Sequence, residues 1–156
     1  MQDWGGAETA VLGMLITSAA VSYTHLGDAV LRETAASLTK SIRAEDFVCR
    51  FGGEEFVVIL PTADLGASSA RAERVRLKMK ELTVLHQGRS MGMLTISVGV
   101  AVFPAHGTSP QELMAAADAA LYEAKRNGRD QVALASLKSV EEAGMHSAEK
   151  SVASGK

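Results

Sequence analysis

Two adjacent carboxylates at a glycine turn, Glu54 and Glu55, are the residues of this chain best suited to chemistry. They follow Gly52 and Gly53, and an apolar run lies on each side of the four residues. Two glycines between apolar runs predict a tight hairpin, because glycine reaches positive φ without a steric cost. Carboxylate oxygens suit hard cations such as Mg²⁺, which is usually shared between carboxylates and substrate phosphates. The glycines also remove side chains that would keep a phosphate away from the backbone N–H groups.

The same four residues also fit a solvated hairpin, whose acids only discourage pairing with another strand edge. In the catalytic interpretation, strands over 47–51 and 56–60 hold the acids rigidly at an exposed edge of the sheet. The residue types alone leave both interpretations open.

Apolar periodicity predicts three helices and several strands around this turn. Asp28 stands at an N-cap position before a helical pattern over 29–42, and a second helix is expected over about 64–86. Ser109 begins a third helix, which Gly128 ends. The expected strands are 47–51, 56–60, 93–103 and 131–135. Helices packed on a mostly antiparallel central sheet give an α+β sandwich.

Composition and charge restrict the function further. The 156 residues make one domain, with 47% hydrophobic and 22% charged residues. The formal net charge of −2 argues against a protein that binds the phosphate backbone of nucleic acid. The single Cys49 excludes an internal disulfide, and we expect it to be a small core residue in a reducing cytoplasm. The longest apolar run, 10–21, is too short to span a bilayer, so we expect no membrane contact by this segment.

Several separated motifs, taken together, resemble the GGDEF family, the diguanylate cyclases. The resemblance covers about 27–132, roughly two-thirds of the chain, with the motifs in the family's order. The matching pieces are Gly52-Gly53-Glu54-Glu55-Phe56 for the signature in its Glu variant, Gly27-Asp28 with Leu31 for GDxxL, Arg43 with Asp46 for RxxD, Thr95–Ala101 for SxGVA, and Ala120–Arg129 for ALYxAKxxGR.

The resemblance implies a nucleotidyl-cyclase, ferredoxin-like fold and a specific reaction. Two GTP molecules condense to cyclic di-GMP and release pyrophosphate, with Mg²⁺ or Mn²⁺ as the cofactor. Glu54 and Glu55 would bind the metal, and Glu55 would also help to deprotonate the attacking 3′-hydroxyl. Gly52 and Gly53 would let the phosphates approach the backbone.

The remaining site residues are also implied by the resemblance, and each has a simpler interpretation. Lys125 and Arg129 would neutralise phosphate charge, or they only complement the C-terminus of a helix. Asp28 would bind the guanine base, or it is only an N-cap. Arg43 and Asp46 would form an allosteric site for the product as an inhibitor, or they are only a surface ion pair.

The family's reaction implies partners outside a single chain. Each domain would hold one GTP, so catalysis needs a homodimer with the active site at its two-fold interface. In the family, an upstream sensory domain commonly controls this pairing. We expect a cytoplasmic protein of bacterial second-messenger signalling that binds no nucleic acid.

The resemblance fails before residue 27. The family has a DxDxFKxxND piece there, whose metal-binding Asp would fall near Val11 and whose guanine-binding Asn would fall near Ala19. We therefore interpret 1–26 as an atypical and possibly foreign segment, 27–135 as a GGDEF domain incomplete at its N-terminus, and 136–156 as a polar tail. Without the Asp, the chain fits either a cyclase or a degenerate domain that binds GTP or cyclic di-GMP. A purely structural fragment is the third alternative.

Overall fold

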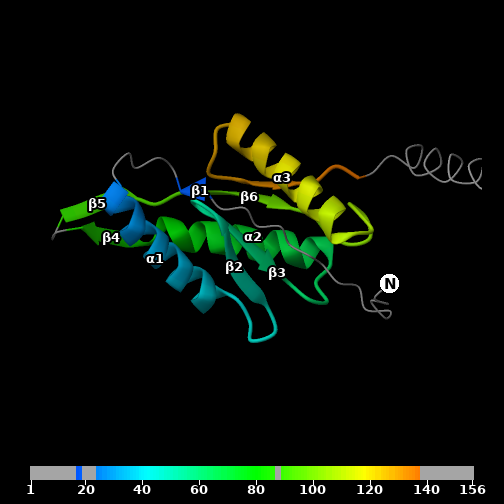
Figure 1. Cartoon of the computed structure of the whole chain (residues 1–156), viewed down its shortest axis with the longest axis horizontal. Helices are drawn as coiled ribbons and strands as arrows, with labels where there is room; N and C mark the ends of the chain where they lie inside the picture. The colour runs from blue at the N-terminus through cyan, green and yellow to red at the C-terminus, as the bar shows by residue number, and fades with distance from the viewer. Residues whose placement is uncertain (1–16, 19–23, 87–88, 138–156) are drawn as a thin grey trace, which may run out of the picture.

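The structure, a computed structural model, describes residues 17–18, 24–86 and 89–137 (Figure 1). The predictions for 1–16, 19–23 and 138–156 lie outside the described residues. The elements in chain order are β1 (Thr17–Ser18), α1 (Thr24–Ser41), β2 (Phe47–Gly52), β3 (Glu55–Ile59), α2 (Leu65–Lys80), β4 (Thr83–His86), β5 (Arg89–Met93), β6 (Ile96–Val100), α3 (Pro110–Arg126) and β7 (Val132–Leu134).

The described strands form three small sheets. β6 pairs with β1 in antiparallel and with β7 in parallel orientation, while the β2–β3 and β4–β5 hairpins are separate two-stranded antiparallel sheets. Helices with mostly antiparallel strands confirm the expected α+β class. The single central sheet expected from the sequence is divided into pieces in the part of the chain that the structure describes.

The core is built around β6, in which all five residues are buried. α3 and α2 both contact this strand, and Figure 1 shows it between the two helices. The contact with α3 depends on Gly99, because a Cβ atom there would lie 2.1 Å from the carbonyl oxygen of Ala117 and 2.5 Å from the amide nitrogen of Leu121. A side chain at this position would therefore push α3 away from the strand.

The first helix begins earlier than expected, and the second ends earlier. α1 begins at Thr24, so Asp28 lies inside the helix and is not its N-cap. α2 ends at Lys80 rather than near His86, and the backbone N–H of Glu81 closes its last turn. Residues 83–86 form β4 instead, because β5 supplies a hydrogen-bonding partner and Val84 is buried there. Sequence periodicity does not reveal such a partner.

The start of α3 agrees with the prediction. The Ser109 hydroxyl accepts a hydrogen bond from the Glu112 N–H at 3.2 Å, and the Glu112 carboxylate accepts one from the Thr108 N–H at 2.7 Å. The first contact satisfies a donor of the first turn that has no partner within the helix, and the second satisfies the backbone N–H just before the N-cap. No helix in the described part of the chain is long and apolar enough to cross a bilayer.

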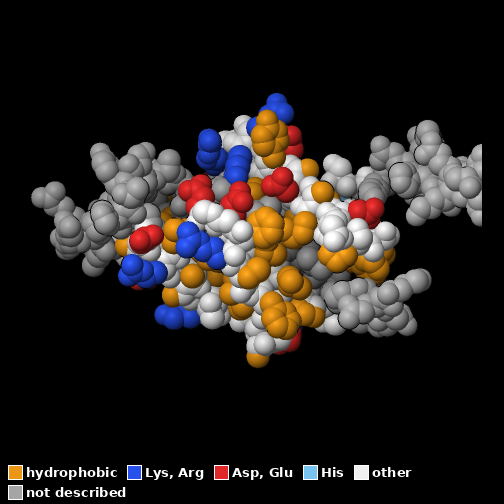
Figure 2. All heavy atoms as spheres, viewed as in Figure 1, with side chains coloured by type: hydrophobic (Ala, Val, Ile, Leu, Met, Phe, Trp, Pro, Cys, Tyr) orange, Lys and Arg blue, Asp and Glu red, His pale blue; other side chains and the backbone are white. Residues whose placement is uncertain are grey.

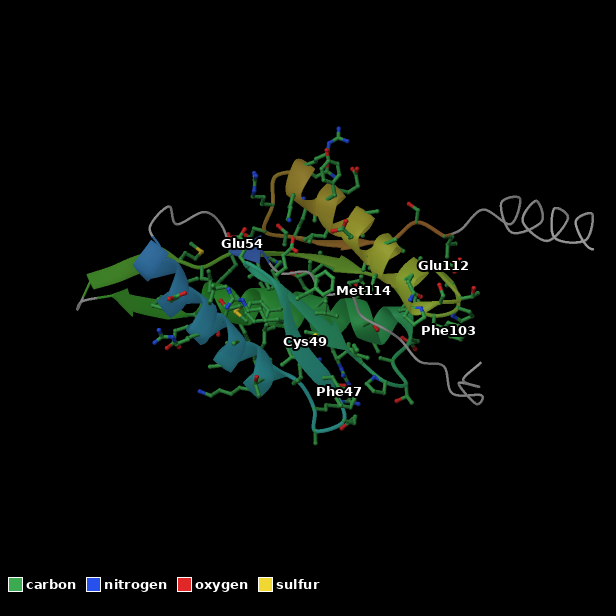
Figure 3. The ribbon with its side chains drawn as sticks, viewed as in Figure 1. Phe47, Cys49, Glu54, Phe103, Glu112 and Met114 are labelled. Atoms are coloured by element: carbon green, nitrogen blue, oxygen red, sulfur yellow. The ribbon has the colours of Figure 1, made fainter. Side chains whose placement is uncertain are left out.

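One face of β2 is open to solvent, which was not expected. The side chains of Phe47 and Phe51 are 63% and 64% exposed, and Cys49 between them is exposed as well. The expectation of a buried Cys49 is therefore wrong. An apolar strand indicates a core position only when another element covers it, and no described element covers this face. Figure 3 shows Phe47 and Glu54 near opposite ends of the hairpin, with Cys49 between them.

Candidate active site

The predicted hairpin is present, and its turn carries the two acids. Gly52 pairs with Glu55, and the register shifts between Arg50 and Gly52, which bends the strand just before the turn. Neither Gly52 nor Gly53 has the positive φ that two glycines in a tight turn predict. What Gly53 provides is space, since a Cβ atom there would meet no atom within 4 Å. The backbone at the turn is therefore open to a ligand.

Arg50 braces this turn and was not identified from the sequence. Its Nε and Nη2 atoms donate hydrogen bonds to the carbonyl oxygen of Gly53 at 3.0 and 2.5 Å. The only sequence signal is an arginine three residues before the second glycine. The brace fixes the peptide that precedes Glu54.

The structure brings the acidic turn to the C-terminal end of α3. The Lys125 Nζ atom lies 3.8 Å from Glu55 Oε1, and both side chains are partly buried. Glu54 is exposed at the end of the hairpin (Figure 3). Figure 2 shows acidic and basic side chains gathered side by side on this part of the surface, next to an apolar area. Two of the predicted groups therefore meet, although they are far apart in the sequence.

A second turn, after α3, carries the other predicted cation. Gly128, Arg129 and Asp130 have φ values of 108°, 61° and 45°. The left-handed region costs a non-glycine residue about 1–2 kcal/mol, so this turn needs support from outside. The Arg129 N–H donates to the Ala124 carbonyl oxygen at 3.0 Å. The Arg129 side chain is exposed, and no hydrogen bond or ion pair of that side chain occurs within the described residues.

The support comes from α2. Arg76 Nη1 donates to Asp130 Oδ1 at 2.6 Å and to the Asp130 carbonyl oxygen at 3.1 Å, and Lys80 Nζ lies 2.6 Å from Asp130 Oδ2. Glu73 accepts from Arg76 Nε and Nη2 at 2.8 and 2.6 Å. Arg76 is only 12% exposed, so its guanidinium is held between two carboxylates with little solvent.

These contacts shift the pKa values of Asp130, Glu73 and Arg76. Burial raises the pKa of Asp130, but hydrogen bonds from Lys80 and Arg76 outweigh burial and hold it below its usual value. The hydrogen bond from Arg76 lowers the pKa of Glu73 against the smaller effect of burial. The hydrogen bond to Glu73, followed by that to Asp130, raises the pKa of Arg76. Glu73, Arg76 and Asp130 therefore stay charged at neutral pH.

Asp28 lines a cavity that reaches the braced turn. The cavity has a volume of about 440 Å³ and lies between α1 and the β2–β3 hairpin. Its lining residues are Asp28, Leu31, Arg32, Ala35, Val48, Cys49, Arg50 and Phe56. Because Arg50 both lines the cavity and holds the Gly53 carbonyl, the cavity adjoins the hairpin turn. Apolar side chains, one carboxylate and two guanidinium groups line it, and the carboxylate can accept hydrogen bonds from a heterocycle with N–H donors.

Arg43 and Asp46 do not form the surface ion pair that the sequence left open. The Asp46 carboxylate is buried and accepts from Arg71 Nη1 at 3.0 and 2.8 Å, and from the Arg43 backbone N–H at 2.8 Å. The Arg43 side chain is exposed and lies 3.6 Å from Glu45. Arg71, on α2, is the partly buried partner of this carboxylate.

The donor set at the hairpin turn fits a hard divalent cation. Glu54 and Glu55 supply carboxylate oxygens, and the open backbone at Gly53 leaves room for phosphate oxygens to supply the other ligands. The described residues contain no group of three or more histidine, cysteine or carboxylate side chains that could hold a metal. Two carboxylates beside an open backbone suit a cation that is shared with a bound phosphate.

Comparisons with known proteins identify a family. The model of the family described as "Diguanylate cyclase, GGDEF domain" matches residues 24–131. Response regulator PleD of Caulobacter vibrioides is 45% identical over 109 residues, which are 69% of this chain and 24% of that protein. Diguanylate cyclase A of Treponema denticola is 39% identical over 114 residues, which are 72% of this chain and 30% of that protein. The chain thus spans under a third of the length of these two relatives.

A solved structure gives the same result for the fold. The crystal structure of the GGDEF domain of DgcB from Caulobacter crescentus, in complex with c-di-GMP, has a TM-score of 0.68 and 25% sequence identity. The match covers 81% of this chain and 78% of that one.

Proposed function

This chain belongs to the GGDEF family, and from that membership we propose that it is a diguanylate cyclase domain, which joins two GTP molecules into cyclic di-GMP and releases two pyrophosphates. The observation that carries the proposal is the contact between Glu55 and Lys125. It places the acidic turn and the basic end of α3 around one location, as the handling of a nucleoside triphosphate requires.

The acidic turn supplies the reacting end of the site. The 3′-hydroxyl oxygen of one GTP attacks the α-phosphorus of the other, the bond to pyrophosphate breaks, and Glu55 takes the hydroxyl proton. Gly53, with no atom within 4 Å of the place of its missing Cβ, admits phosphate oxygens to the backbone. A divalent cation bound by Glu54 and Glu55 would neutralise charge on the phosphates, and Mg²⁺ or Mn²⁺ suits these oxygen ligands.

The basic end of α3 neutralises the leaving group. Lys125, close to Glu55, acts as a compact charge, while Arg129 can donate two parallel hydrogen bonds to one phosphate. The free side chain of Arg129 is exposed toward solvent and so is available to a ligand. Asp28, in the cavity beside the turn, would accept hydrogen bonds from the guanine N–H groups.

The reaction also needs a second copy of the chain, because each site holds one GTP. We propose that two copies form a homodimer in which the hairpin turns face each other. We also propose that the protein is cytoplasmic, because GTP is available there. One solved relative is in complex with c-di-GMP, and Arg43 with Asp46 is the segment proposed for inhibition by the product. The exposed Arg43 side chain is available for that role, while Asp46 is held by Arg71. An upstream sensory domain in the parent protein would control the pairing.

The test is a turnover assay with purified chain, GTP and Mg²⁺, in which pyrophosphate and cyclic di-GMP are measured. We expect Glu55→Gln to lower turnover about 10²–10⁴-fold, because the substitution removes both the proton acceptor and a metal ligand. Glu81→Gln, which removes the same charge at the end of α2, is the matched control and should leave turnover unchanged. Equal turnover in the chain and in Glu55→Gln would overturn the proposal.

A second candidate function is nucleotide binding without turnover. Val11, outside the described residues, stands where the resemblance places a metal-binding aspartate. Loss of one carboxylate ligand weakens metal binding and slows catalysis. This candidate predicts that the chain binds GTP or cyclic di-GMP in equilibrium dialysis but yields no pyrophosphate. If the chain shows neither binding nor turnover, the remaining alternative is a purely structural fragment.

A further inference from the structure

The turn of Gly128, Arg129 and Asp130 has an unusual backbone for its sequence. Three consecutive residues have positive φ, and only the first is a glycine. A residue in the left-handed region persists only when its surroundings hold it there. The contacts that hold this turn therefore decide where the Arg129 side chain points.

Most of the side-chain contacts on this turn are made by α2, far away in the sequence. The Arg76 guanidinium donates to both the carboxylate and the backbone carbonyl oxygen of Asp130, at 2.6 and 3.1 Å. Lys80 lies 2.6 Å from the other carboxylate oxygen. Asp130 is thus held at its side chain and at the peptide that follows it.

Glu73 in turn fixes Arg76. Its two oxygens accept from Nε and Nη2, at 2.8 and 2.6 Å, so that Nη1 is left for Asp130. A fork held on one edge by a carboxylate has little freedom to rotate. The contacts form a chain from α2 to the residue next to Arg129.

We infer that Arg76 and Asp130 are positioning residues for phosphate binding: the Arg76–Asp130 contact holds the turn after α3 so that Arg129 points its guanidinium at the triphosphate. The inference rests on the proposed function, because it requires that Arg129 binds phosphate. Arg76 and Asp130 do not touch the nucleotide themselves, and their effect passes through Arg129.

A purely structural role for the same contacts makes a different prediction. If Arg76 and Asp130 only join α2 to the α3–β7 connection, their loss lowers the stability of the whole chain and weakens every ligand alike. If they position Arg129, their loss weakens ligands with β- and γ-phosphates and spares those without. Comparison of GTP with GMP separates the two roles.

The experiment measures equilibrium binding of GTP and of GMP to the full chain by isothermal titration calorimetry in Mg²⁺. Arg129→Ala should weaken GTP binding about tenfold or more, as expected for lost hydrogen bonds to a charged group, and change GMP binding less than about twofold. Arg76→Ala should reproduce most of this pattern. Asp130→Gly should also weaken GTP binding and spare GMP binding. Glycine is chosen because it tolerates the backbone at φ 45°, so the fold is preserved while the side-chain contacts are lost.

A double-mutant cycle provides the decisive comparison. In the Arg129→Ala background, Arg76→Ala should weaken GTP binding less than about twofold further, because its effect acts through a side chain that is already gone. Arg76→Lys, which keeps the charge but lacks the fork, should recover only part of the affinity. Arg126→Ala is the control for loss of one nearby positive charge, since Arg126 pairs with Glu123 in an exposed contact.

Each contrary outcome has a distinct meaning. Full additivity in the cycle, or equal losses for GTP and GMP, would overturn the positioning role while leaving the proposed function intact. Unchanged GTP binding by both Arg76→Ala and Asp130→Gly would do the same. If the unaltered chain binds no GTP, or if Arg129→Ala has no effect, the role of Arg129 fails and the inference fails with it.

Discussion

The two turns of the candidate site are supported in opposite ways. The hairpin turn at Gly53 and Glu54 is held by the strands that flank it and by Arg50, three residues away. The turn at 128–130 has three left-handed residues, and it is held by Arg76 and Lys80 from another helix. One turn is specified by its own neighbourhood, and the other depends on tertiary contacts. A site built in this way has one half that forms locally and one half that forms only when the whole fold does.

The strongest test of this contrast concerns the segment that leads into the hairpin. Arg71→Ala leaves the buried Asp46 carboxylate without its charged partner, and breaking a buried pair costs about 3–5 kcal/mol. We expect a loss of this size in the free energy of unfolding, measured by urea titration. Such a loss would show that the contacts which hold the hairpin are local only from Phe47 onward, because Asp46, just before it, depends on Arg71 of α2.

Arg43→Ala is the control for that experiment. Its exposed pair with Glu45 should contribute no more than about 1 kcal/mol. A similar small change for Arg71→Ala would mean that Asp46 does not need its partner, and remote support would then be confined to the second turn.

A matched pair of glycine substitutions compares the two turns directly. Gly128→Ala places a side chain at φ +108°, and we expect it to lower the free energy of unfolding by about 1–2 kcal/mol. Gly53→Ala enters open space without left-handed backbone, so it should change stability by less than about 0.5 kcal/mol. Thermal and urea unfolding of both variants provide the measurement. Equal losses would remove the contrast between the two turns.

Gly53→Ala has a second use in nucleotide binding. If phosphates approach the backbone at this turn, the added methyl group should weaken GTP binding even though the fold is intact. Normal GTP affinity in Gly53→Ala would show that phosphates do not use this space.

The smallest expected effect is a sensitivity of the second turn to acid. The pKa values of Asp130 and Glu73 are lowered in the folded chain, so the unfolded chain binds more protons in acid. Their stabilisation is present above the pKa of the unfolded carboxyls, about 4, and is lost as the pH falls through the lower folded values. Urea midpoints measured from about pH 6 down to about pH 3 should fall less steeply in Asp130→Asn than in the unaltered chain. Parallel curves would show that the Asp130 contacts do not depend on its charge.

The contrast between the turns also explains what the sequence could and could not predict. The hairpin, its acids and the start of α3 follow from neighbouring residues, and the structure has them as expected. The roles of Arg71 and Arg76 could not be predicted, because their partners lie 25 and 54 residues away. On a helix pattern both arginines look like solvent-facing residues.

Errors in the prediction have the same origin. Cys49 and Phe47 alternate with Val48 as in a covered strand, but only Val48 packs against the core. Residues 83–86 continue the apolar pattern of α2, but β5 pairs with them and makes them a strand. In both cases a contact with another segment, or its absence among the described residues, decided the outcome.

The placement of Arg71 and Arg76 on one helix makes α2 a spacer of fixed length. Arg71 binds Asp46 beside the hairpin, and Arg76 binds Asp130 in the turn after α3. About one and a half helical turns separate the two arginines. Inserting a single residue between them would rotate one relative to the other by about 100°. The chain can therefore accept changes of residue type along this stretch more readily than a change in the number of residues.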